Sequence, residues 1–476
     1  MFDIQKFVTR QKCLLIAPAG YGKTHTIISE SLKNTKGKQL ILTHTHAGVS
    51  SIKEKLKKAQ IPSYNYNVET ITSFAQKYVL SFYINKADIP KQEDSNAYYP
   101  FIIKEANNIV KLKPIIKVIS STYSGLFVDE YQDCTIEQHE LILSLSSLLP
   151  TRILGDHLQG IFDFNNGNLV DFKHKSMKEF NSNLFKLETP WRWYNNSRKD
   201  LGDDLKAIRE KLLNKEVIDL RNYKSIETNV FNENELTDYR PNRYSRFMWK
   251  VLNKDNPLLM HPDSTSIHPR LYIIKKFNNS FSLLESIDNK DFYKFSREID
   301  GANTSNIASI VFKFSLSVFK KTEVRNWLNE NGAISKRGEE EKALIAPLKT
   351  NFEALKSDKS FLIISDSLEI INNSLKITCY RKELLKSMID ALYDAHVNHI
   401  SVYEAMVNKR NKIRRMGKKI YGNCIGTTLL TKGLEFDTVV ILNAHSFSCP
   451  KHLYVALTRA SKRLVVITTN PILNPY

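Results

Sequence analysis

The residues best suited to chemistry begin with Ala17-Pro-Ala-Gly-Tyr-Gly-Lys-Thr24. Gly20 and Gly22 allow backbone N–H groups to turn toward phosphate oxygens. Lys23 adds a positive charge for the β- and γ-phosphates, and Thr24 offers a hydroxyl to Mg²⁺. A short apolar run precedes the segment, and a helix-like run, 26–32, follows it. The segment therefore predicts a phosphate-binding loop between a strand and a helix.

A second segment, Leu126-Phe-Val-Asp-Glu-Tyr-Gln-Asp133, supplies the carboxylates that such a loop requires. Its apolar residues predict a buried strand, so Asp129 and Glu130 stand at the end of that strand. One carboxylate can hold a Mg²⁺-bound water, and the next can orient an attacking water. Together the two segments predict a site that hydrolyses a nucleoside triphosphate.

Composition limits the classes of protein that could carry this site. The 476 residues are 42% hydrophobic and 25% charged, which is typical of a globular chain of two or three domains. The 69 basic and 50 acidic side chains give a net charge of +19, which favours nucleic acid as a partner. The five cysteines form no C-x-x-C pair, so neither zinc nor a disulfide framework is indicated. The sequence has neither a leader-like segment nor a membrane-length apolar run, so we expect a cytoplasmic protein without a membrane partner.

The order of apolar runs predicts an α/β fold with parallel sheets flanked by helices. We expect a first domain over 1–190, with an insertion at about 84–120, and a second domain over 191–476, with a mostly helical insertion at about 289–419. The strands expected in the first domain are 13–17, 39–43, 126–129 and 152–155. Those expected in the second are 256–261, 438–442 and 463–468.

A run of basic residues closes the helical insertion. It consists of Lys409, Arg410, Lys412, Arg414, Arg415, Lys418 and Lys419. A solvated helix face and a phosphate-contacting face both fit this composition, and the sequence leaves the two open.

Further short segments recur in a characteristic order. D-E-x-Q-D at 129–133 is followed by Gly155-Asp-His-Leu-Gln159, Thr189-Pro-Trp-Arg-Trp193, Lys432-Gly-Leu-Glu-Phe436 and Tyr454-Val-Ala-Leu-Thr-Arg-Ala460. This order resembles that of superfamily 1 helicases of the UvrD/Rep/PcrA type, in a compact form similar to the helicase component of the Gabija antiphage system. The resemblance implies two RecA-like P-loop NTPase domains, with ATP and Mg²⁺ as cofactors.

The resemblance also assigns roles to individual residues. It implies that Gln159 senses the γ-phosphate, that Arg192 and Arg459 reach it from the second domain, and that Trp191 stacks on the base. The catalytic set is then Lys23, Glu130, Gln159, Arg192 and Arg459, with Thr24 and Asp129 on the metal. The nucleotide-binding set is Ala19, Gly20, Gly22, Lys23, Thr24, Asp129, Trp191, Gly433 and Glu435.

Nucleic-acid contacts follow from the same resemblance. Thr43, Thr45, Thr70, Phe74 and Thr427 stand in segments that the family uses to contact single-stranded DNA, and hydroxyls suit backbone phosphates. Phe162 and Phe164 stand where the family has aromatics that stack on bases, although core packing also fits their alternation.

The resemblance thus implies a DNA-dependent ATPase and a 3′-to-5′ DNA helicase or translocase acting on single-stranded or tailed duplex DNA. The alternative is a DNA-sensing ATPase subunit that regulates a separate nuclease, for example in antiviral defence, with the helical insertion as the docking surface.

Overall fold

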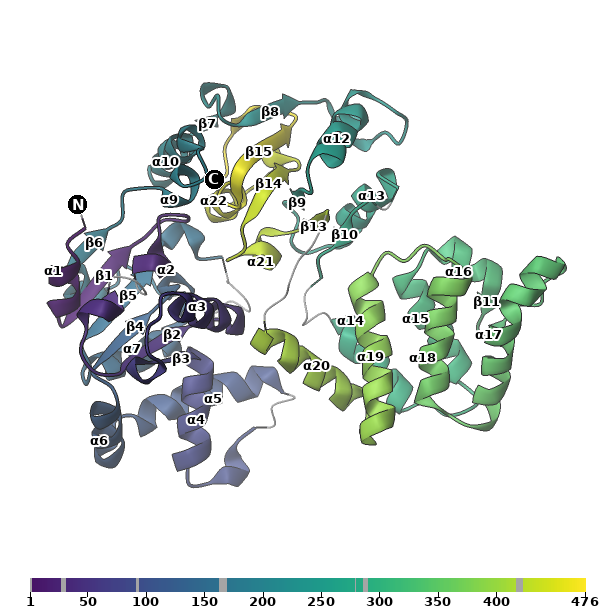
Figure 1. The fold of residues 1–476 in the computed structure, drawn as a ribbon, viewed down its shortest axis with the longest axis horizontal. Helices are drawn as coiled ribbons and strands as arrows, with labels where there is room; N and C mark the ends of the chain where they lie inside the picture. Colours follow the sequence, from purple (N-terminus) through teal and green to yellow (C-terminus); the bar gives the residue numbers. More distant parts are fainter. Residues whose placement is uncertain are drawn as a thin grey trace. The chain divides into compact units, whose positions relative to one another are not determined.

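The computed structural model describes residues 2–26, 31–90, 94–161, 169–278, 280–285, 290–416 and 423–476. The chain forms two compact units. One unit contains Met1–Leu236 together with Thr431–Tyr476, and the other contains Thr237–Leu430 (Figure 1).

Among the described residues of the first unit, six strands form a parallel sheet in the order β3-β2-β4-β5-β1-β6. Their bounds are β1 Lys12–Ile16, β2 Gln39–Thr43, β3 Tyr66–Thr70, β4 Gly125–Val128, β5 Thr151–Gly155 and β6 Leu184–Lys186. The four strands expected from the sequence correspond to β1, β2, β4 and β5, with ends that differ by one residue at most. Every residue of β2, β4 and β5 is buried, and each strand has an apolar stretch: 40–42 in β2, 126–128 in β4 and 153–154 in β5.

Helices cover both faces of this sheet. Leu40 and Leu42 of β2 face one hydrophobic cluster, and Ile41 between them faces another. This alternation is the strand period of two. The first cluster includes residues of α4 (Ile71–Phe82), α5 (Ser95–Ile109), α6 (Lys113–Thr122) and α7 (Ile136–Ser146). The second includes residues of α1 (Ile4–Thr9) and α3 (His46–Lys58).

A second set of six described strands forms a sheet in the order β10-β13-β9-β14-β15-β8. Their bounds are β8 Glu227–Val230, β9 Leu258–Met260, β10 Ser282–Leu283, β13 Cys424–Gly426, β14 Phe436–Ile441 and β15 Ala460–Thr468. The flanking helices include α9 Trp191–Tyr194, α10 Lys199–Leu213, α12 Arg243–Lys254, α13 His268–Lys276, α21 Thr428–Thr431 and α22 Pro450–Leu457. The expected strands 256–261, 438–442 and 463–468 overlap β9, β14 and β15, with ends that differ by up to three residues. Two sheets flanked by helices confirm the predicted fold class of two RecA-like domains.

Residues 290–416 form a helical segment with its own hydrophobic cluster. Its elements are α14 Lys290–Asp300, α15 Ile307–Val318, α16 Lys321–Trp327, α17 Glu339–Ser357, α18 Phe361–Glu369, α19 Lys382–Asn398 and α20 Val402–Met416, with a short hairpin of β11 (Leu328–Asn329) and β12 (Gly332–Ala333). In the part of the chain that the structure describes, no helix combines the length and the apolar character needed to cross a membrane.

Candidate NTPase site

The predicted phosphate loop connects β1 to the short helix α2 (Lys23–His25). Gly20 has φ +78° and Gly22 has φ +85°, a backbone region that L side chains rarely adopt. A Cβ atom on Gly20 would also lie 2.8 Å from Cζ3 of Trp193. Both glycines are therefore required, Gly20 by conformation and by space.

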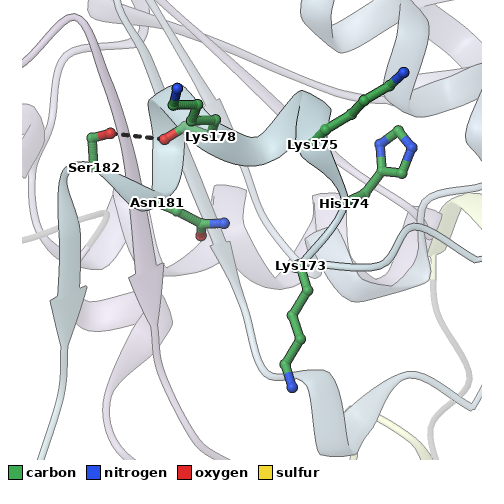
Figure 2. Close-up of a pocket in the computed structure, with 6 residues that line it drawn as sticks. All are labelled: Lys173, His174, Lys175, Lys178, Asn181 and Ser182. Carbon is green, nitrogen blue, oxygen red and sulfur yellow. Dashed lines mark hydrogen bonds between the residues drawn. The ribbon is translucent and has the colours of Figure 1, made fainter.

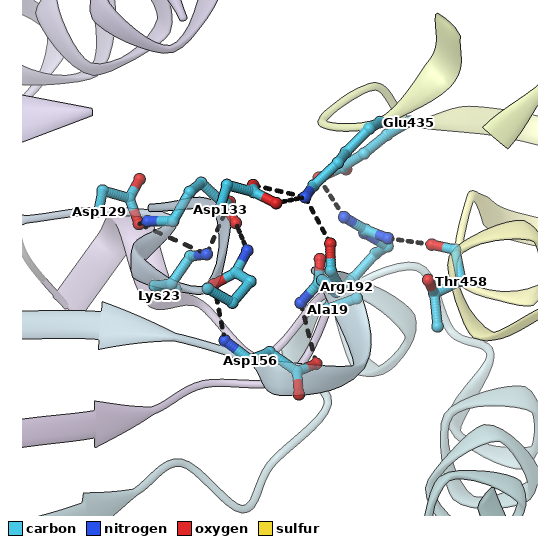
Figure 3. Close-up of polar contacts among 12 residues, drawn as sticks. Ala19, Lys23, Asp129, Asp133, Asp156, Arg192, Glu435 and Thr458 are labelled. Carbon is cyan, nitrogen blue, oxygen red and sulfur yellow. Dashed lines mark hydrogen bonds and ion pairs between the residues drawn. The ribbon is translucent and has the colours of Figure 1, made fainter. Parts of the chain in front are cut away.

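Lys23 extends from this loop to the two predicted carboxylates (Figure 3). Its Nζ lies 2.6 Å from Oε1 of Glu130 and 3.4 Å from Oδ1 of Asp129. Burial lowers the pKa of Lys23, but the charges of Asp129 and Glu130 outweigh burial and raise it above the ordinary value. Lys23 is thus held as a cation at the position where phosphate charge is expected.

The two carboxylates differ in their electrostatics. Burial raises the pKa of Asp129, and Lys23 offsets this only in part. Burial also acts on Glu130, but Lys23 and Lys432 overcome it and lower the pKa of Glu130 to about 2. Glu130 has φ +55°, an uncommon conformation for a residue with a side chain, which is often found at functional sites. Its carboxylate is therefore ionised and held on a strained turn.

Gln132 links this turn to the segment that contains Gln159. Its Nε2 donates to Oε2 of Glu130, and its Oε1 accepts the N–H of Asp156 at 3.0 Å. The side chain of Gln159 donates to Oδ2 of Asp156 at 3.0 Å. Asp156 is fully buried. Glu130 and Gln159 are therefore linked through the side chain of Gln132 and through the backbone N–H and the carboxylate of Asp156.

The predicted arginines lie beside Thr458 and the C-terminal end of the K-G-L-E-F segment. Nη2 of Arg192 lies 2.6 Å from Oε1 of Glu435, and Nη1 donates to the carbonyl of Thr458. Arg459 is 2% exposed and donates to the carbonyls of Val455 and Leu434. Burial, followed by repulsion from Arg192, lowers the pKa of Arg459 to about 10. The structure thus brings the two arginines into one electrostatic cluster.

Trp191 and Trp193 flank the phosphate loop in different ways. Trp193 is buried, and its Nε1 donates to the carbonyl of Ala460 at 2.8 Å. Trp191 is 52% exposed, and its Cδ1 lies 3.4 Å from the position of a Cβ on Gly22. An exposed aromatic ring next to a phosphate loop can stack on a nucleotide base.

Three residues of this site, Lys432, Tyr454 and Arg209, make contacts that were not predicted from the sequence. Nζ of Lys432 lies 2.6 Å from Oδ1 of Asp133 and also donates to the carbonyl of Gln159. The hydroxyl of Tyr454 accepts the N–H of Ala19 at 3.3 Å. These residues stood within recognised segments, but composition gave no sign of their partners.

The third residue with an unpredicted contact is Arg209, whose Nη2 lies 2.8 Å from Oδ1 of Asp156. Arg209 lies on α10 outside any recognised segment, and the sequence offered only a basic residue beside an apolar helix face.

The expected nucleic-acid residues have varied environments. Thr45 is exposed and accepts the N–H of Gly48, and Thr70 accepts the N–H of Ser73. Thr43, Thr70 and Thr427 are buried. Phe74 is fully buried in the hydrophobic cluster beneath α4. The side chain of Phe74 packs in this cluster, whereas the sequence predicted a contact with single-stranded DNA. The motif alone did not show that Phe74 lies on the buried face of α4.

The remaining predictions concern Gly433 and four residues outside the part of the chain that the structure describes. Gly433 has φ +81° and open space around a notional Cβ. Phe162, Phe164, Lys418 and Lys419 lie outside the described residues.

Two family models match separate parts of the chain. Residues 3–165 match the model of an AAA domain, and residues 355–468 match the model of a viral superfamily 1 RNA helicase core domain. Each model covers less than half of the chain, so the matches show likeness to these two domains. The matched regions contain Lys23, Glu130 and Arg459, which also lie in the charged site.

Other comparisons are distant. No curated protein matches the sequence. The structure of PRRSV helicase aligns with 98% of this chain and 55% of its own, at 11% identity and a TM-score of 0.36. A complex structure of arterivirus nonstructural protein 10 (helicase) with DNA aligns with 38% of this chain and 36% of its own, at 14% identity and a TM-score of 0.21. The chain thus spans about half the length of the PRRSV helicase chain.

Proposed function

We propose that this helicase-like chain is an ATP-driven motor of the UvrD type that moves along single-stranded DNA in the 3′-to-5′ direction. One observation carries the proposal. A phosphate loop, two carboxylates and two arginines, all drawn from separated segments, meet in one charged cluster of the first compact unit.

The donor groups of this cluster fit ATP with Mg²⁺. Thr24 and Asp129 offer hard oxygen ligands, and Mg²⁺ commonly takes only one or two protein oxygens because water and phosphates complete its shell. Bound there, Mg²⁺ would neutralise the developing phosphate charge. The amides of the loop, together with Lys23, would hold the β- and γ-phosphates.

In hydrolysis, the oxygen of a water attacks the γ-phosphorus while the bond to the bridging oxygen of ADP breaks. Glu130, ionised and oriented by Gln132, accepts a hydrogen bond from that water. Arg192 and Arg459 supply guanidinium groups, which suit the charge that spreads over the phosphoryl oxygens in the transition state.

Strand movement would follow from nucleotide-dependent rearrangement of these contacts. The contact between Lys432 and Asp133 joins a residue beside β14 to a residue beside β4, so closure around ATP and release after hydrolysis would change both segments. The net charge of +19 favours a phosphodiester backbone as the track.

The test is the steady-state ATPase rate with no nucleic acid, single-stranded DNA, single-stranded RNA, and duplexes with a 3′ or a 5′ tail. We expect single-stranded DNA to stimulate hydrolysis and a 3′-tailed duplex to be unwound. Stimulation without unwinding would favour the ATPase subunit that regulates a nuclease. Stimulation by RNA alone would contradict the assignment to DNA. An ATPase rate that no nucleic acid changes would contradict the proposal of a nucleic-acid motor.

A further inference from the structure

A basic surface pocket, open to solvent, lies in the first unit (Figure 2). Its volume is about 460 Å³. Cationic and neutral polar side chains line it, without a carboxylate: Lys173, His174, Lys175, Lys178, Asn181 and Ser182. This lining offers hydrogen-bond donors and positive charge, which together suit a phosphate group.

The backbone that carries these side chains is anchored. Met177 and Phe180 are fully buried between the lining residues. Nδ2 of Asn181 donates to the carbonyl of Phe172 at 2.8 Å, and Oγ of Ser182 donates to the carbonyl of Lys178 at 2.9 Å. The cavity wall is therefore fixed by packing and by local hydrogen bonds.

The charge of the cavity is not neutralised by its surroundings. Among the described residues, Lys173, Lys175 and Lys178 have no ion-pair partner. The neighbouring Glu179 is paired with Nζ of Lys12 at 2.5 Å. Asp171 accepts the backbone N–H of Lys173, so one carboxylate stands near the rim without an ion pair to the lysines.

A chain of hydrogen bonds leads inward from this cavity to the nucleotide site. Nδ1 of His174 lies 2.7 Å from Oγ of Ser176, which lies 2.6 Å from Nε2 of His139. Nδ1 of His139 is hydrogen-bonded to the hydroxyl of Tyr131. Tyr131 follows Glu130 directly in the sequence.

The direction of this chain follows from the ionisation of its buried members. Tyr131 carries a phenolic O–H, which can donate a hydrogen bond. Burial, with a smaller effect of His174, lowers the pKa of His139 to about 4, so His139 has one donor and one acceptor nitrogen at neutral pH. Tyr131 then donates to Nδ1 of His139, and Nε2–H of His139 donates to Ser176.

The outer end of the chain is the ring of His174. Its Nδ1 accepts the backbone N–H of Ser176 at 3.3 Å and lies 2.7 Å from Oγ of Ser176. Among the described residues, its Nε2 has no hydrogen-bond partner. An N–H at Nε2 can donate to a phosphate oxygen, which would favour one direction of the whole chain.

The inner end of the chain lies in the 3₁₀ turn η5 (Tyr131–Asp133), which supports the catalytic carboxylate. In this turn Gln132 donates to Glu130, and Asp133 is paired with Lys432. A change in the hydroxyl of Tyr131 therefore acts on the turn that orients Glu130.

We propose that the cavity lined by residues 173–182 binds a backbone phosphate of the nucleic-acid strand, and that the chain His174–Ser176–His139–Tyr131 transmits its occupancy to Glu130. The proposal rests on the proposed function, because it requires a strand whose binding stimulates hydrolysis.

The test of the site compares Lys175→Gln/Lys178→Gln with a matched double variant, Lys113→Gln/Lys117→Gln, on the exposed face of α6. The affinity for labelled single-stranded DNA and RNA is measured by anisotropy at several salt concentrations. Each lost contact with a single strand should lower the slope of log K against log salt by about 0.7. We expect a weaker affinity and a smaller slope for the cavity variant, and wild-type values for the α6 variant.

The outcomes distinguish a backbone phosphate from free inorganic phosphate, and failure of this site from failure of the proposed function. If inorganic phosphate raises the melting temperature of the wild type but not of the cavity variant, while both bind strands equally, the cavity takes free phosphate and the proposal is overturned. Equal affinity and slope in both variants and the wild type also overturn it. If the wild type neither binds a strand nor responds to one, the proposed function itself fails.

Ser176→Ala tests the transmission, because it interrupts the hydrogen-bond chain and retains the lysines. We expect strand affinity within about twofold of the wild type, but at least a twofold loss in the ratio of kcat with saturating strand to kcat without strand. Ser120→Ala, which removes an exposed hydroxyl on α6 that bonds to the carbonyl of Ile116, is the control for this ratio. A wild-type ratio in a folded Ser176→Ala protein overturns the transmission.

Discussion

The nucleotide site and the helical segment 290–416 differ in what they bury. The site buries many ionisable side chains, among them Lys23, Asp129, Asp133, Asp156, Arg209 and Arg459. The helical segment buries apolar residues and a few serines, with Arg381 as its buried ionisable residue, paired with Glu285 at 2.5 Å. Because burying an ion costs several kcal/mol unless it is well paired, the charges of the site are not explained by stability. The difference indicates that one region is built for chemistry and the other for packing.

The buried charges of the site also form a connected set. Lys23 contacts Glu130, Lys432 contacts Asp133, and Arg209 contacts Asp156. Each cation thus joins a different part of the chain to the strand ends of the first sheet. Predictions that separate chemical from packing roles follow from this arrangement.

The largest effect is expected for Arg192. Arg192→Ala should lower kcat for ATP by a factor on the order of 10³ with a much smaller change in ATP affinity, because a transition-state charge loses its partner. Arg192→Lys should recover this only in part, since an ammonium lacks the planar fork of a guanidinium. Steady-state kinetics check it, with Arg325→Ala on the exposed side of α16 as the control. A kcat within tenfold of the wild type would remove Arg192 from the mechanism.

The next effect concerns the buried pair of Lys432 and Asp133. Lys432→Met should destabilise the protein by about 3 to 5 kcal/mol, because it leaves Asp133 buried without a cation. Burial, partly offset by Lys432, raises the pKa of Asp133 to about 6. The loss should therefore be larger at pH 8, where the carboxylate must ionise, than at pH 5. Thermal melting at both pH values measures this, and an equal shift at pH 5 and pH 8 would contradict it.

A smaller effect should appear in the pH dependence of stability through His139. Its folded pKa of about 4 lies below the ordinary value of 6.5, so the unfolded chain binds more protons between these values. This contribution is present above pH 6.5 and is lost as the pH falls toward 4, by at most about 3 kcal/mol. His139→Gln should make melting less steeply dependent on pH in this window, whereas His396→Gln, on α19, should not. Identical profiles for the wild type and His139→Gln would exclude this contribution.

The smallest effect is expected for the exposed ion pairs of the helical segment. Glu339 and Glu353 of α17 pair with Lys342 and Lys356, and all four side chains are more than half exposed. Surface pairs of this kind contribute about 0.5 kcal/mol or less. Glu339→Gln/Glu353→Gln should leave the melting temperature and the ATPase rate close to those of the wild type. A shift of several degrees would show that packing alone does not account for this segment.

The sequence predicted the parts of the fold whose signal is local. β2 and β4 are fully buried runs, and their positions were predicted to within a residue. β6 is exposed at both ends, and β10 has two residues, so neither gives a readable apolar pattern. The fold class was confirmed, whereas the domain boundaries and the roles of the site residues stay predictions.

Contacts over long sequence separations could not be predicted. Lys432 and Asp133 are 299 residues apart, and Arg209 and Asp156 are 53 apart. Their pairing depends on how strand ends and helices come together, which residue type alone does not specify. Phe74 illustrates the same dependence on packing. Its motif suggested a contact with single-stranded DNA, but the packing of α4 buries its side chain.

In the proposed mechanism, Lys23 binds the phosphates and Glu130 orients the attacking water. The most direct measurement combines titration of a fluorescent ATP analogue in the presence of Mg²⁺ with single-turnover hydrolysis, for the wild type, Lys23→Ala and Glu130→Gln. We expect Lys23→Ala to lose binding, and Glu130→Gln to bind ATP while its turnover falls by a factor on the order of 10³ or more, because an amide retains the size of the carboxylate without its charge. Turnover at the wild-type rate in Glu130→Gln would contradict the account.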